Sequence, residues 1–144
     1  MGFGQAIKHV FGNYANFQGR ASRSEFWWWY LFVVIVNAII SIPYSIGLGQ
    51  STSAMVVDSK TGELVSGGLN GLAVFGIILV VAWGLAILLP TISVSVRRLH
   101  DTDRSGAWWW LNFLCCVGGI ILLIFYIMPS TPGPNRFGDG PATA

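Results

Sequence analysis

Hydrophobic residues near the N-terminus recur at the spacing of a helix, and polar residues fill the opposite face. The hydrophobic positions are Phe3, Ile7, Val10, Phe11, Tyr14 and Phe17. A segment with this pattern is too polar to cross a bilayer, and such helices lie in the membrane interface. We therefore predict an amphipathic surface helix over residues 3–18. The alternative is a helix that packs on the protein's own core.

Three long hydrophobic segments follow, at residues 26–46, 72–96 and 107–128, and none of them contains a charged residue. At a rise of about 1.5 Å per residue, the first reaches roughly 30 Å, the thickness of the hydrocarbon core of a bilayer. The pattern predicts three transmembrane helices, and therefore an all-α membrane protein with a single membrane domain over residues 1–144. Pro90 removes one backbone hydrogen bond and predicts a kink in the second span.

The segments between and after these spans are polar. Residues 47–70 are rich in Gly, Ser and Thr, and two β-prone stretches, 55–57 and 63–65, flank a short turn segment. This pattern is typical of a small surface β-hairpin, with a disordered loop as the alternative. Residues 97–106 form a short polar loop. Residues 129–144 are rich in Pro and Gly, and we expect a flexible tail without regular structure.

The amino-acid composition indicates that the chain is surrounded by lipid and not by water. Hydrophobic residues make up 53% of the chain and charged residues 10%, whereas a soluble domain has about 25% charged residues. The two cysteines, Cys115 and Cys116, are adjacent in a hydrophobic segment, which is neither the spacing of a metal site nor a favourable arrangement for a disulfide. We expect no metal and no cofactor.

The positive charges are unevenly distributed between the predicted spans. Lys8, Arg20 and Arg23 precede the first span, Arg97, Arg98 and Arg104 lie between the second and third, and Lys60 and Arg136 stand alone in their segments. Clustered lysines and arginines mark cytoplasmic segments. We therefore expect a cytoplasmic N-terminus and 97–106 loop, with the 47–70 loop and the C-terminus outside the cytoplasm.

An alternative topology bends the last hydrophobic segment at Gly118 and Gly119. The tail would then return to the cytoplasmic side, where Asn135 and Arg136 could join the other polar residues. Each half of the segment would have only about ten residues, which is too short to span a bilayer.

One pattern, Arg-Ser followed by two residues and three tryptophans, opens two of the hydrophobic segments. It occupies residues 23–29 and again residues 104–110. Arginines favour the headgroups and indole rings the membrane interface, so the pattern forms an aromatic belt. It predicts that the first and third spans begin on the same side. Because the tryptophans lie at span edges, base stacking is disfavoured, and we expect no nucleic-acid partner.

The predicted cytoplasmic face carries a polar set with two interpretations. Its members are Arg20, Arg23, Glu25, Arg97, Arg98, His100, Asp101 and Arg104. In the first interpretation, the cations anchor the protein to anionic lipid headgroups. In the second, Glu25 and Asp101 pair with the arginines and His100 and lock two spans together. A catalytic or metal-binding role for His100 is disfavoured, because one histidine with the carboxylates of Asp101 and Asp103 and no nucleophile is a weak set, and His9 lies in a different element. We expect no catalytic residue.

Several polar residues lie within the predicted spans, and the candidates for intramembrane contacts are Asn37, Ser41 and Asn112. Polar side chains inside a bilayer commonly hydrogen-bond to a neighbouring helix. The alternative is the lining of a solute path. No ionisable residue lies within a span, so an ion-coupled pump has no obvious charge relay.

Three motifs, in chain order, resemble those of a known family. The first motif is FQGRASRSEFW at residues 17–27. The second, at residues 97–108, is RRLHD followed by RSG and Trp, and the third is TPGPNRFG at residues 131–138. They resemble the opening, central and closing motifs of the domain of unknown function 805 family, small bacterial inner-membrane proteins. The resemblance covers nearly the whole chain, although residues 47–70 are longer than expected. It implies a fold and a location. The family has no assigned activity, so the resemblance implies no mechanism.

These observations favour a multi-pass protein of the bacterial cytoplasmic (inner) membrane without enzymatic activity. We expect a structural or interaction subunit that contacts a bilayer with anionic headgroups. Three spans make a thin bundle, so homo-oligomerisation or a partner membrane protein is a reasonable hypothesis. The alternatives are a subunit of a small channel or transporter, and a membrane-embedded enzyme that acts on lipid headgroups with His100 and Asp101.

Overall fold

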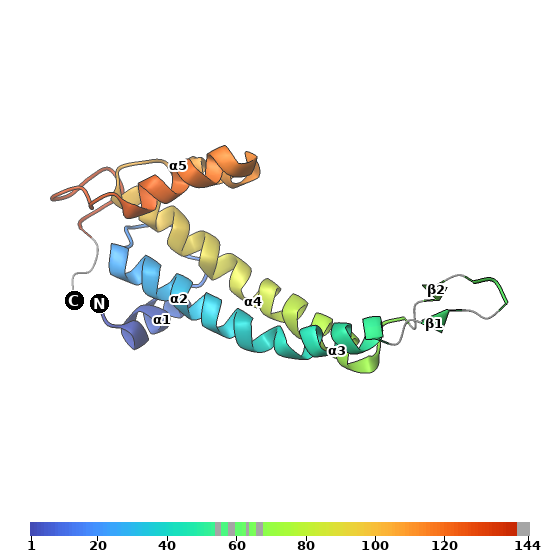
Figure 1. The fold of residues 1–144 in the computed structure, drawn as a ribbon. Coiled ribbons are helices and arrows are strands. Elements are labelled where there is room, and N and C mark those ends of the chain that lie inside the picture. The colour runs from blue at the N-terminus through green and yellow to red at the C-terminus, as the bar shows by residue number, and fades with distance from the viewer. Residues whose placement is uncertain (54–55, 58–59, 63, 66–67, 141–144) are drawn as a thin grey trace. The chain divides into compact units, whose positions relative to one another are not determined.

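The computed structural model describes residues 1–53, 56–57, 60–62, 64–65 and 68–140. Its elements are α1 (Phe3–Gly12), α2 (Arg23–Ile40), α3 (Ile42–Ser53), β1 (Val56–Val57), β2 (Leu64–Val65), α4 (Gly71–Asp101), the 3-10 helix η1 (Gly106–Phe113) and α5 (Cys115–Ile127) (Figure 1). The chain forms two compact units, one of residues 1–32 with 87–144 and one of residues 33–86. The prediction of a helical fold is confirmed.

Two helical segments are long and hydrophobic enough to cross a membrane, Arg23–Thr52 with 30 residues and Gly71–Asp101 with 31 residues. Only 6% and 11% of their most hydrophobic windows are buried within the protein. A helix in the core of a soluble protein buries its hydrophobic side chains, whereas these windows expose them. Their exposure therefore favours lipid as the surrounding solvent.

The first hydrophobic helix extends beyond its predicted end at residue 46. Ser51 and Thr52 donate hydroxyl hydrogen bonds to the carbonyl oxygens of Gly47 and Leu48, at 2.9 and 3.1 Å. Hydroxyl groups that bond to the preceding helical turn satisfy their own polarity. The start of the predicted 47–70 loop is therefore helical, and α3 ends at Ser53.

In the unit of residues 33–86, α3 and α4 approach closely at two glycines. A Cβ atom on Gly47 would overlap the backbone of Ala73, and a Cβ atom on Gly76 would overlap the backbone of Tyr44. Small residues allow helix backbones to come this close, which is a common mode of helix packing in membranes. These two glycines therefore set the spacing between α3 and α4.

The predicted hairpin is present as a short antiparallel strand pair in the same unit. Val56 lies opposite Val65, and Val57 lies opposite Leu64. The other residues assigned to this hairpin include positions 55, 58, 59 and 63, which lie outside the described residues.

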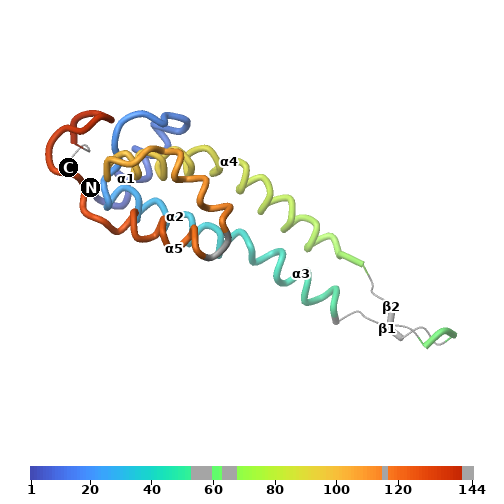
Figure 2. The backbone as a smooth tube through the Cα atoms, turned by 90° about the horizontal axis from the view of Figure 1, so that it is seen from above, coloured from blue at the N-terminus to red at the C-terminus, as the bar shows by residue number. Residues whose placement is uncertain are grey.

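The prediction of one continuous span over residues 107–128 is wrong, because two shorter helices replace it. η1 ends at Phe113, Leu114 turns the chain, and α5 runs back beside η1 (Figure 2). The amide of Leu114 donates to the carbonyl of Leu111 at 2.9 Å. A Cβ atom on Gly118 would overlap that same carbonyl oxygen. The turn therefore requires glycine at position 118, a constraint that hydrophobic composition alone does not reveal.

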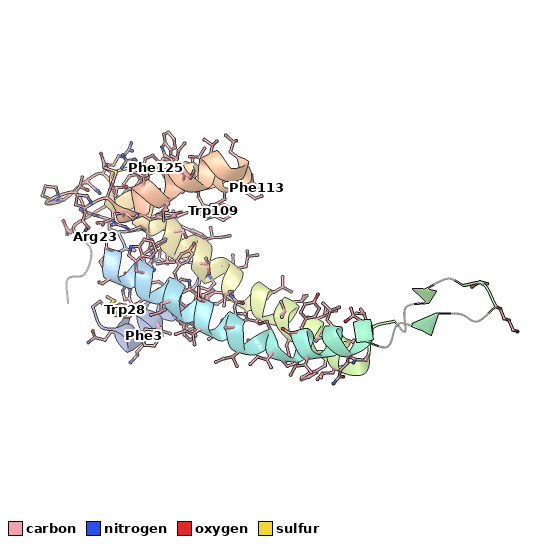
Figure 3. All side chains as sticks on the ribbon, in the orientation of Figure 1. Phe3, Arg23, Trp28, Trp109, Phe113 and Phe125 are labelled. Carbon is pink, nitrogen blue, oxygen red and sulfur yellow. The ribbon has the colours of Figure 1, made fainter. Side chains whose placement is uncertain are left out.

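The N-terminal helix is shorter than the predicted 3–18 and packs on the protein. α1 ends at Gly12, where the side-chain amide of Asn13 donates to the carbonyl of His9 at 2.9 Å. The ring of Phe3 contacts Trp28 edge to face with centroids 5.6 Å apart (Figure 3). Phe3 keeps 39% of its surface exposed. The structure thus supports the alternative of packing on the core, while hydrophobic surface on α1 stays open.

Candidate functional site

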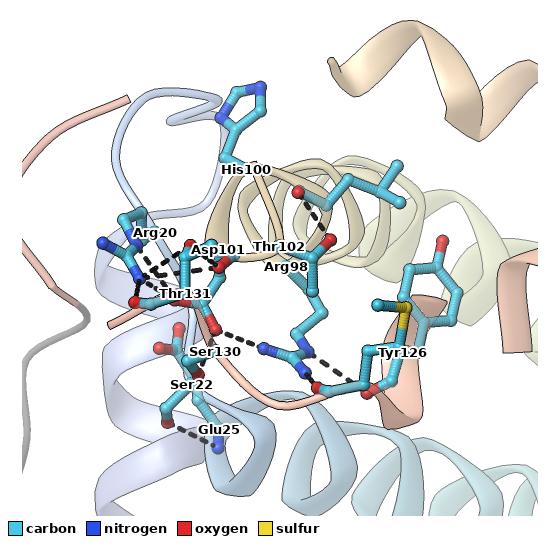
Figure 4. Close-up of polar contacts among 12 residues, drawn as sticks. Arg20, Ser22, Glu25, Arg98, His100, Asp101, Thr102, Tyr126, Ser130 and Thr131 are labelled. Carbon is cyan, nitrogen blue, oxygen red and sulfur yellow. Dashed lines mark hydrogen bonds and ion pairs between the residues drawn. The ribbon is translucent and has the colours of Figure 1, made fainter. Parts of the chain in front are cut away.

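Asp101, the last residue of α4, is the centre of a buried polar cluster (Figure 4). Its Oδ1 accepts a hydrogen bond from Nε of Arg20 at 2.9 Å, and its Oδ2 accepts from Arg98 and from the hydroxyl of Ser130. Its backbone carbonyl accepts from the amide and the hydroxyl of Thr131, at 3.0 and 2.6 Å. All three oxygens of Asp101 are therefore bonded to groups of the protein.

Arg20 comes from the segment between α1 and α2 and connects Asp101 to the C-terminal segment. Beyond its bond to the carboxylate, Nη1 donates to the carbonyl of Gly133 and Nη2 to that of Thr131, each at 2.6 Å. A guanidinium group offers five donors in one plane, so it can bind a carboxylate and two carbonyl oxygens at once. Arg20 thus joins three segments that are distant in the sequence.

Arg98 binds the end of α5. Its Nε donates to the carbonyl of Tyr126 at 3.2 Å, and its Nη2 donates to the carbonyl of Met128. The last carbonyl groups of a helix have no partner within that helix, and a basic side chain can supply one. Arg98 is completely buried, so its contacts with Asp101 and these carbonyls replace the water that the charge has lost.

The expected position of the tail, on the opposite side from Arg20, is incompatible with these bonds. Residues 128–133 lie against Arg20, Arg98 and Asp101. Further along the tail, the side-chain amide of Asn135 donates to the carbonyl of His100 at 2.9 Å. The tail therefore lies beside the cluster, as the alternative with a bend in the last hydrophobic segment expects, but the chain turns at Leu114 instead of at Gly118 and Gly119.

His100 contacts backbone and an aromatic ring, and no ion pair of His100 is found among the described residues. Its Nδ1 lies 3.2 Å from the carbonyl oxygen of Gly19, and its imidazole stacks on the ring of Phe137 with centroids 3.9 Å apart. The predicted pairing of His100 with a carboxylate is thus replaced by a hydrogen bond and stacking. These contacts hold the tail on one side of His100 and the segment before α2 on the other.

Glu25 is the centre of a second buried group. Its Oε1 lies 2.9 Å from Nδ1 of His9 and 2.9 Å from Nη2 of Arg97. The contact with Arg97 is an ion pair whose angles do not make a hydrogen bond, and Nε of Arg97 has no hydrogen-bond partner among the described residues. The amide of Glu25 donates to the hydroxyl of Ser22 at 3.2 Å, as in a helix cap. This group connects α1, α2 and α4.

The remaining residues of the predicted polar set lie apart from these two groups. Arg23 is exposed at the start of α2. The guanidinium of Arg104 lies 4.0 Å from the ring centroid of Phe125, a cation–π contact. The predicted set therefore divides into two buried groups, His100 between Gly19 and Phe137, and two separate arginines.

Two of the three predicted intramembrane polar residues form hydrogen bonds to their own helical segments. Ser41 donates to the carbonyl of Ala38 at 3.0 Å, and Asn112 donates to the carbonyl of Trp109 at 2.8 Å. Each of these bonds stays within its own helical segment. Asn37 is exposed on α2.

His9, Ser130 and Thr131 belong to the buried groups, although the predicted polar set does not contain them. A signal was available for Thr131, because it opens the third family motif, but the expected topology placed that motif on the other side of the membrane. His9 belongs to α1, and its distance from Glu25 in the sequence gives no indication of their contact. No group of three His, Cys, Asp or Glu side chains that could hold a metal occurs in the described part of the chain.

Curated proteins with similar sequences are inner membrane proteins by name. The chain is 36% identical over 133 residues to inner membrane protein YhaI of Escherichia coli strain K12, covering 92% of this chain and 91% of YhaI. It is 38% identical over 132 residues to inner membrane protein YhaH of the same strain, covering 92% of each chain. No solved structure is significantly similar. Residues 14–139 match the family described as protein of unknown function (DUF805), and the chain belongs to that family.

Proposed function

We propose that this chain is an integral protein of the bacterial inner membrane with a non-enzymatic role, as a structural or interaction subunit. The names of its relatives support the location. Two helices with exposed hydrophobic surface support insertion into lipid. The proposed non-enzymatic role rests mainly on the burial and hydrogen bonding of the Asp101 cluster.

The observation that carries this proposal is the complete burial of Asp101. A general base needs a lone pair that can reach a substrate proton, whereas both carboxylate oxygens of Asp101 are buried and accept hydrogen bonds from the protein. One face of His100 is covered by Phe137. The cluster is therefore suited to holding α4, the segment before α2 and the tail in one arrangement, and it is poorly suited to headgroup chemistry.

The proposed topology has both the N-terminal segment and the tail in the cytoplasm. The arginines of the cluster favour the cytoplasmic side. η1 and α5 then enter and leave the membrane on that side, because their outer ends lie near Asp101. With 8 and 13 residues, they reach only about 16 Å and 20 Å, short of the roughly 30 Å hydrocarbon core.

A surface position for α1 completes this arrangement. Phe3 and Phe11 keep 39% and 41% of their surfaces exposed, and Trp27 and Trp28 keep 41% and 37%. Aromatic rings of this kind favour the level of the headgroups. The exposed face of α1 would thus rest in the interface while its buried face packs on α2.

Asn37 supports an interaction role. Its side chain is exposed on a hydrophobic helix, and no hydrogen bond of its amide group is found among the described residues. An amide in lipid is stabilised by a partner helix, with a contribution of about 0.6–2 kcal/mol. We propose that α2 associates with a second copy or with another membrane protein through this residue. A channel in which Asn37 faces water is the second candidate.

Two experiments test the proposal. A green fluorescent protein fused after residue 144 should fluoresce, and an alkaline phosphatase at the same position should be inactive, because the tail is cytoplasmic.

Crosslinking in native membranes should give a dimer or a complex with another protein that the Asn37→Leu variant loses. An Ile39→Leu variant is the control, since Ile39 is 60% exposed on the same helix. Recovery of only the monomer would contradict the interaction role. Solute flux abolished by Asn37→Leu would favour the channel.

A further inference from the structure

Two pockets lie between the first turns of α2 and the C-terminal part of the chain. The first, the polar pocket, has a volume of about 540 Å³ and is named for the hydroxyl and guanidinium groups among its lining residues, although apolar atoms make up the larger part of its surface. Its lining includes Ser22, Arg23, Ser24, Ser130, Thr131 and Gly133. Figure 4 shows Ser22, Ser130 and Thr131 grouped beside Asp101. The pocket is thus built from the start of α2 and from the tail that the cluster holds in place.

The second pocket has a volume of about 240 Å³ and is mainly hydrophobic. Its lining includes Phe26, Trp27 and Tyr30 of α2, and Gly119, Leu123 and Tyr126 of α5. Both helices are among the hydrophobic segments of the chain, so this pocket opens between surfaces suited to lipid.

The two pockets follow each other along the same helices. On α2, residues 23, 27 and 30 share one face, because residues separated by three or four positions lie on the same side of a helix. Toward the tail, residues 119, 123 and 126 lead along α5 to Ser130. The polar pocket therefore lies at the end of the α2–α5 contact that is next to the Asp101 cluster. The hydrophobic pocket lies further along the two helices, away from that cluster. A phospholipid has the same order of headgroup and acyl chain.

The charges beside the polar pocket are unbalanced. Arg20 and Arg98 are buried and share the single carboxylate of Asp101. Arg23 lines the pocket and lies within electrostatic range of Arg98. The other buried carboxylate, Glu25, is paired with Arg97. Three positive charges thus face one negative charge, and such an excess next to an open pocket attracts an anion.

Arg23 is the residue available to bind that anion. It is exposed at the start of α2 (Figure 3), and no hydrogen bond or ion pair of its guanidinium is found among the described residues. The neighbouring hydroxyl groups of Ser22 and Ser24 are hydrogen-bonded to each other at 3.1 Å, which leaves one hydroxyl hydrogen of the pair free to donate. A guanidinium with one hydroxyl donor is a suitable set for a phosphate oxygen.

We propose that one anionic phospholipid binds between α2 and α5, with its phosphate at Arg23 and an acyl chain in the pocket beside Tyr30 and Gly119. The binding rests on the membrane insertion proposed above. Basic pockets next to membrane helices are known to bind anionic headgroups. The bound lipid would balance the excess positive charge of the cluster and fill the gap between the two helices.

Native mass spectrometry of the protein extracted from the membrane fraction tests this proposal. The detergent-solubilised protein is mixed with phosphatidylglycerol or with phosphatidylcholine, and bound lipid is counted per chain. We expect one phosphatidylglycerol to be retained in preference to phosphatidylcholine. Equal retention of the two lipids would overturn the proposal. Absence of the protein from the membrane fraction would instead contradict the proposed location, so the two failures are distinguishable.

Two variants examine the two halves of the site separately. Arg23→Gln should weaken phosphatidylglycerol retention about fivefold, because a cation near the membrane surface contributes about that factor, while phosphatidylcholine retention stays the same. Lys8→Gln is the matched control, since Lys8 is an exposed cation on α1 outside the pocket. Gly119→Phe should lower retention of both lipids, because a Cβ atom at Gly119 meets open space and the ring would fill the hydrophobic pocket.

The same variants define the results that would contradict the site. Wild-type retention of phosphatidylglycerol by Arg23→Gln would overturn the headgroup position, and unchanged retention by Gly119→Phe would overturn the acyl-chain position. Inorganic phosphate is the final probe. If it displaces the lipid from the wild-type protein, the site recognises a free anion, and the phospholipid proposal is wrong. Thermal unfolding of each variant checks that the fold is retained.

Discussion

Arg20 and Asp101 are 81 positions apart in the sequence, yet Nε of the arginine lies 2.9 Å from Oδ1 of the aspartate, and both side chains are buried. This contact fixes the segment before α2 against the end of α4. The desolvation of two charges is offset only where hydrogen bonds satisfy the remaining donors and acceptors. Ser130, Thr131 and Gly133 supply those bonds. The ion pair and the tail therefore depend on each other.

Removal of the charge of Asp101 should strongly destabilise the protein. In Asp101→Asn, two buried arginines lose their shared carboxylate, and the expected decrease in the free energy of unfolding in detergent is about 3–5 kcal/mol. Asp103→Asn is the matched control, because Asp103 forms an exposed ion pair with Arg136, and exposed pairs contribute at most about 1 kcal/mol. Equal stability of the two variants would contradict the central role of Asp101.

Arg20→Lys should loosen the tail even though the positive charge is kept. One ammonium group cannot bind the carboxylate of Asp101 and the carbonyls of Thr131 and Gly133 in the planar arrangement of a guanidinium. Hydrogen exchange of the Thr131 amide, which donates to Asp101, should become faster, and protease cleavage in residues 128–136 should increase. Arg136→Lys, an exposed control, should leave both measurements close to those of the wild-type protein.

Glu25 and Arg97 should behave as a coupled pair. Glu25→Gln leaves the buried guanidinium of Arg97 without its ion-pair partner, and the expected loss is about 3–5 kcal/mol. The double variant Glu25→Gln with Arg97→Gln removes both charges and should recover part of that stability. A double variant whose loss equals the sum of the two single losses would show that the ion pair contributes nothing.

The turn between η1 and α5 can be tested with two neighbouring glycines. In Gly118→Ala, the new methyl group overlaps the carbonyl oxygen of Leu111, and the strain should cost about 1–3 kcal/mol. In Gly119→Ala, the methyl group meets open space, and alanine should stabilise the helix by about 0.5–1 kcal/mol. A thermal unfolding series on the two variants should therefore give shifts of opposite sign. A shift of the same sign would contradict the turn at Leu114.

The two long hydrophobic helices could be predicted from the sequence, because their length and lack of charge are local properties. The end of α3 could not, since Ser51 and Thr52 look like loop residues until their hydroxyl groups bond to the helix backbone. The reversal of the chain at Leu114 could not be predicted either. A hydrophobic segment of 22 residues satisfies the length criterion for a span whether the chain continues or turns back.

The polar set could be predicted as a group, but its contacts could not be. Arg20, Arg98 and Asp101 were expected on one face because of their positions at span ends. Their partners in the tail were expected on the opposite side of the membrane, because the tail carries a single arginine. One positive charge gives only a weak indication of orientation. The contacts of Arg98 with Tyr126 and Met128 use backbone carbonyl groups. Every residue carries such a group, so no pattern of side chains predicts these contacts.

The turn at Leu114 has a consequence for the biogenesis of the protein. Residues 128–133 leave the ribosome after every other part of the Asp101 cluster, and they supply the carbonyl groups that Arg20 and Arg98 bind. During translation the two arginines and their aspartate must remain hydrated at the membrane surface until these residues arrive. Closure of the cluster thus follows the synthesis of residues 128–133. A chain that stops before Thr131 would keep an open charged surface, which quality-control proteases can recognise.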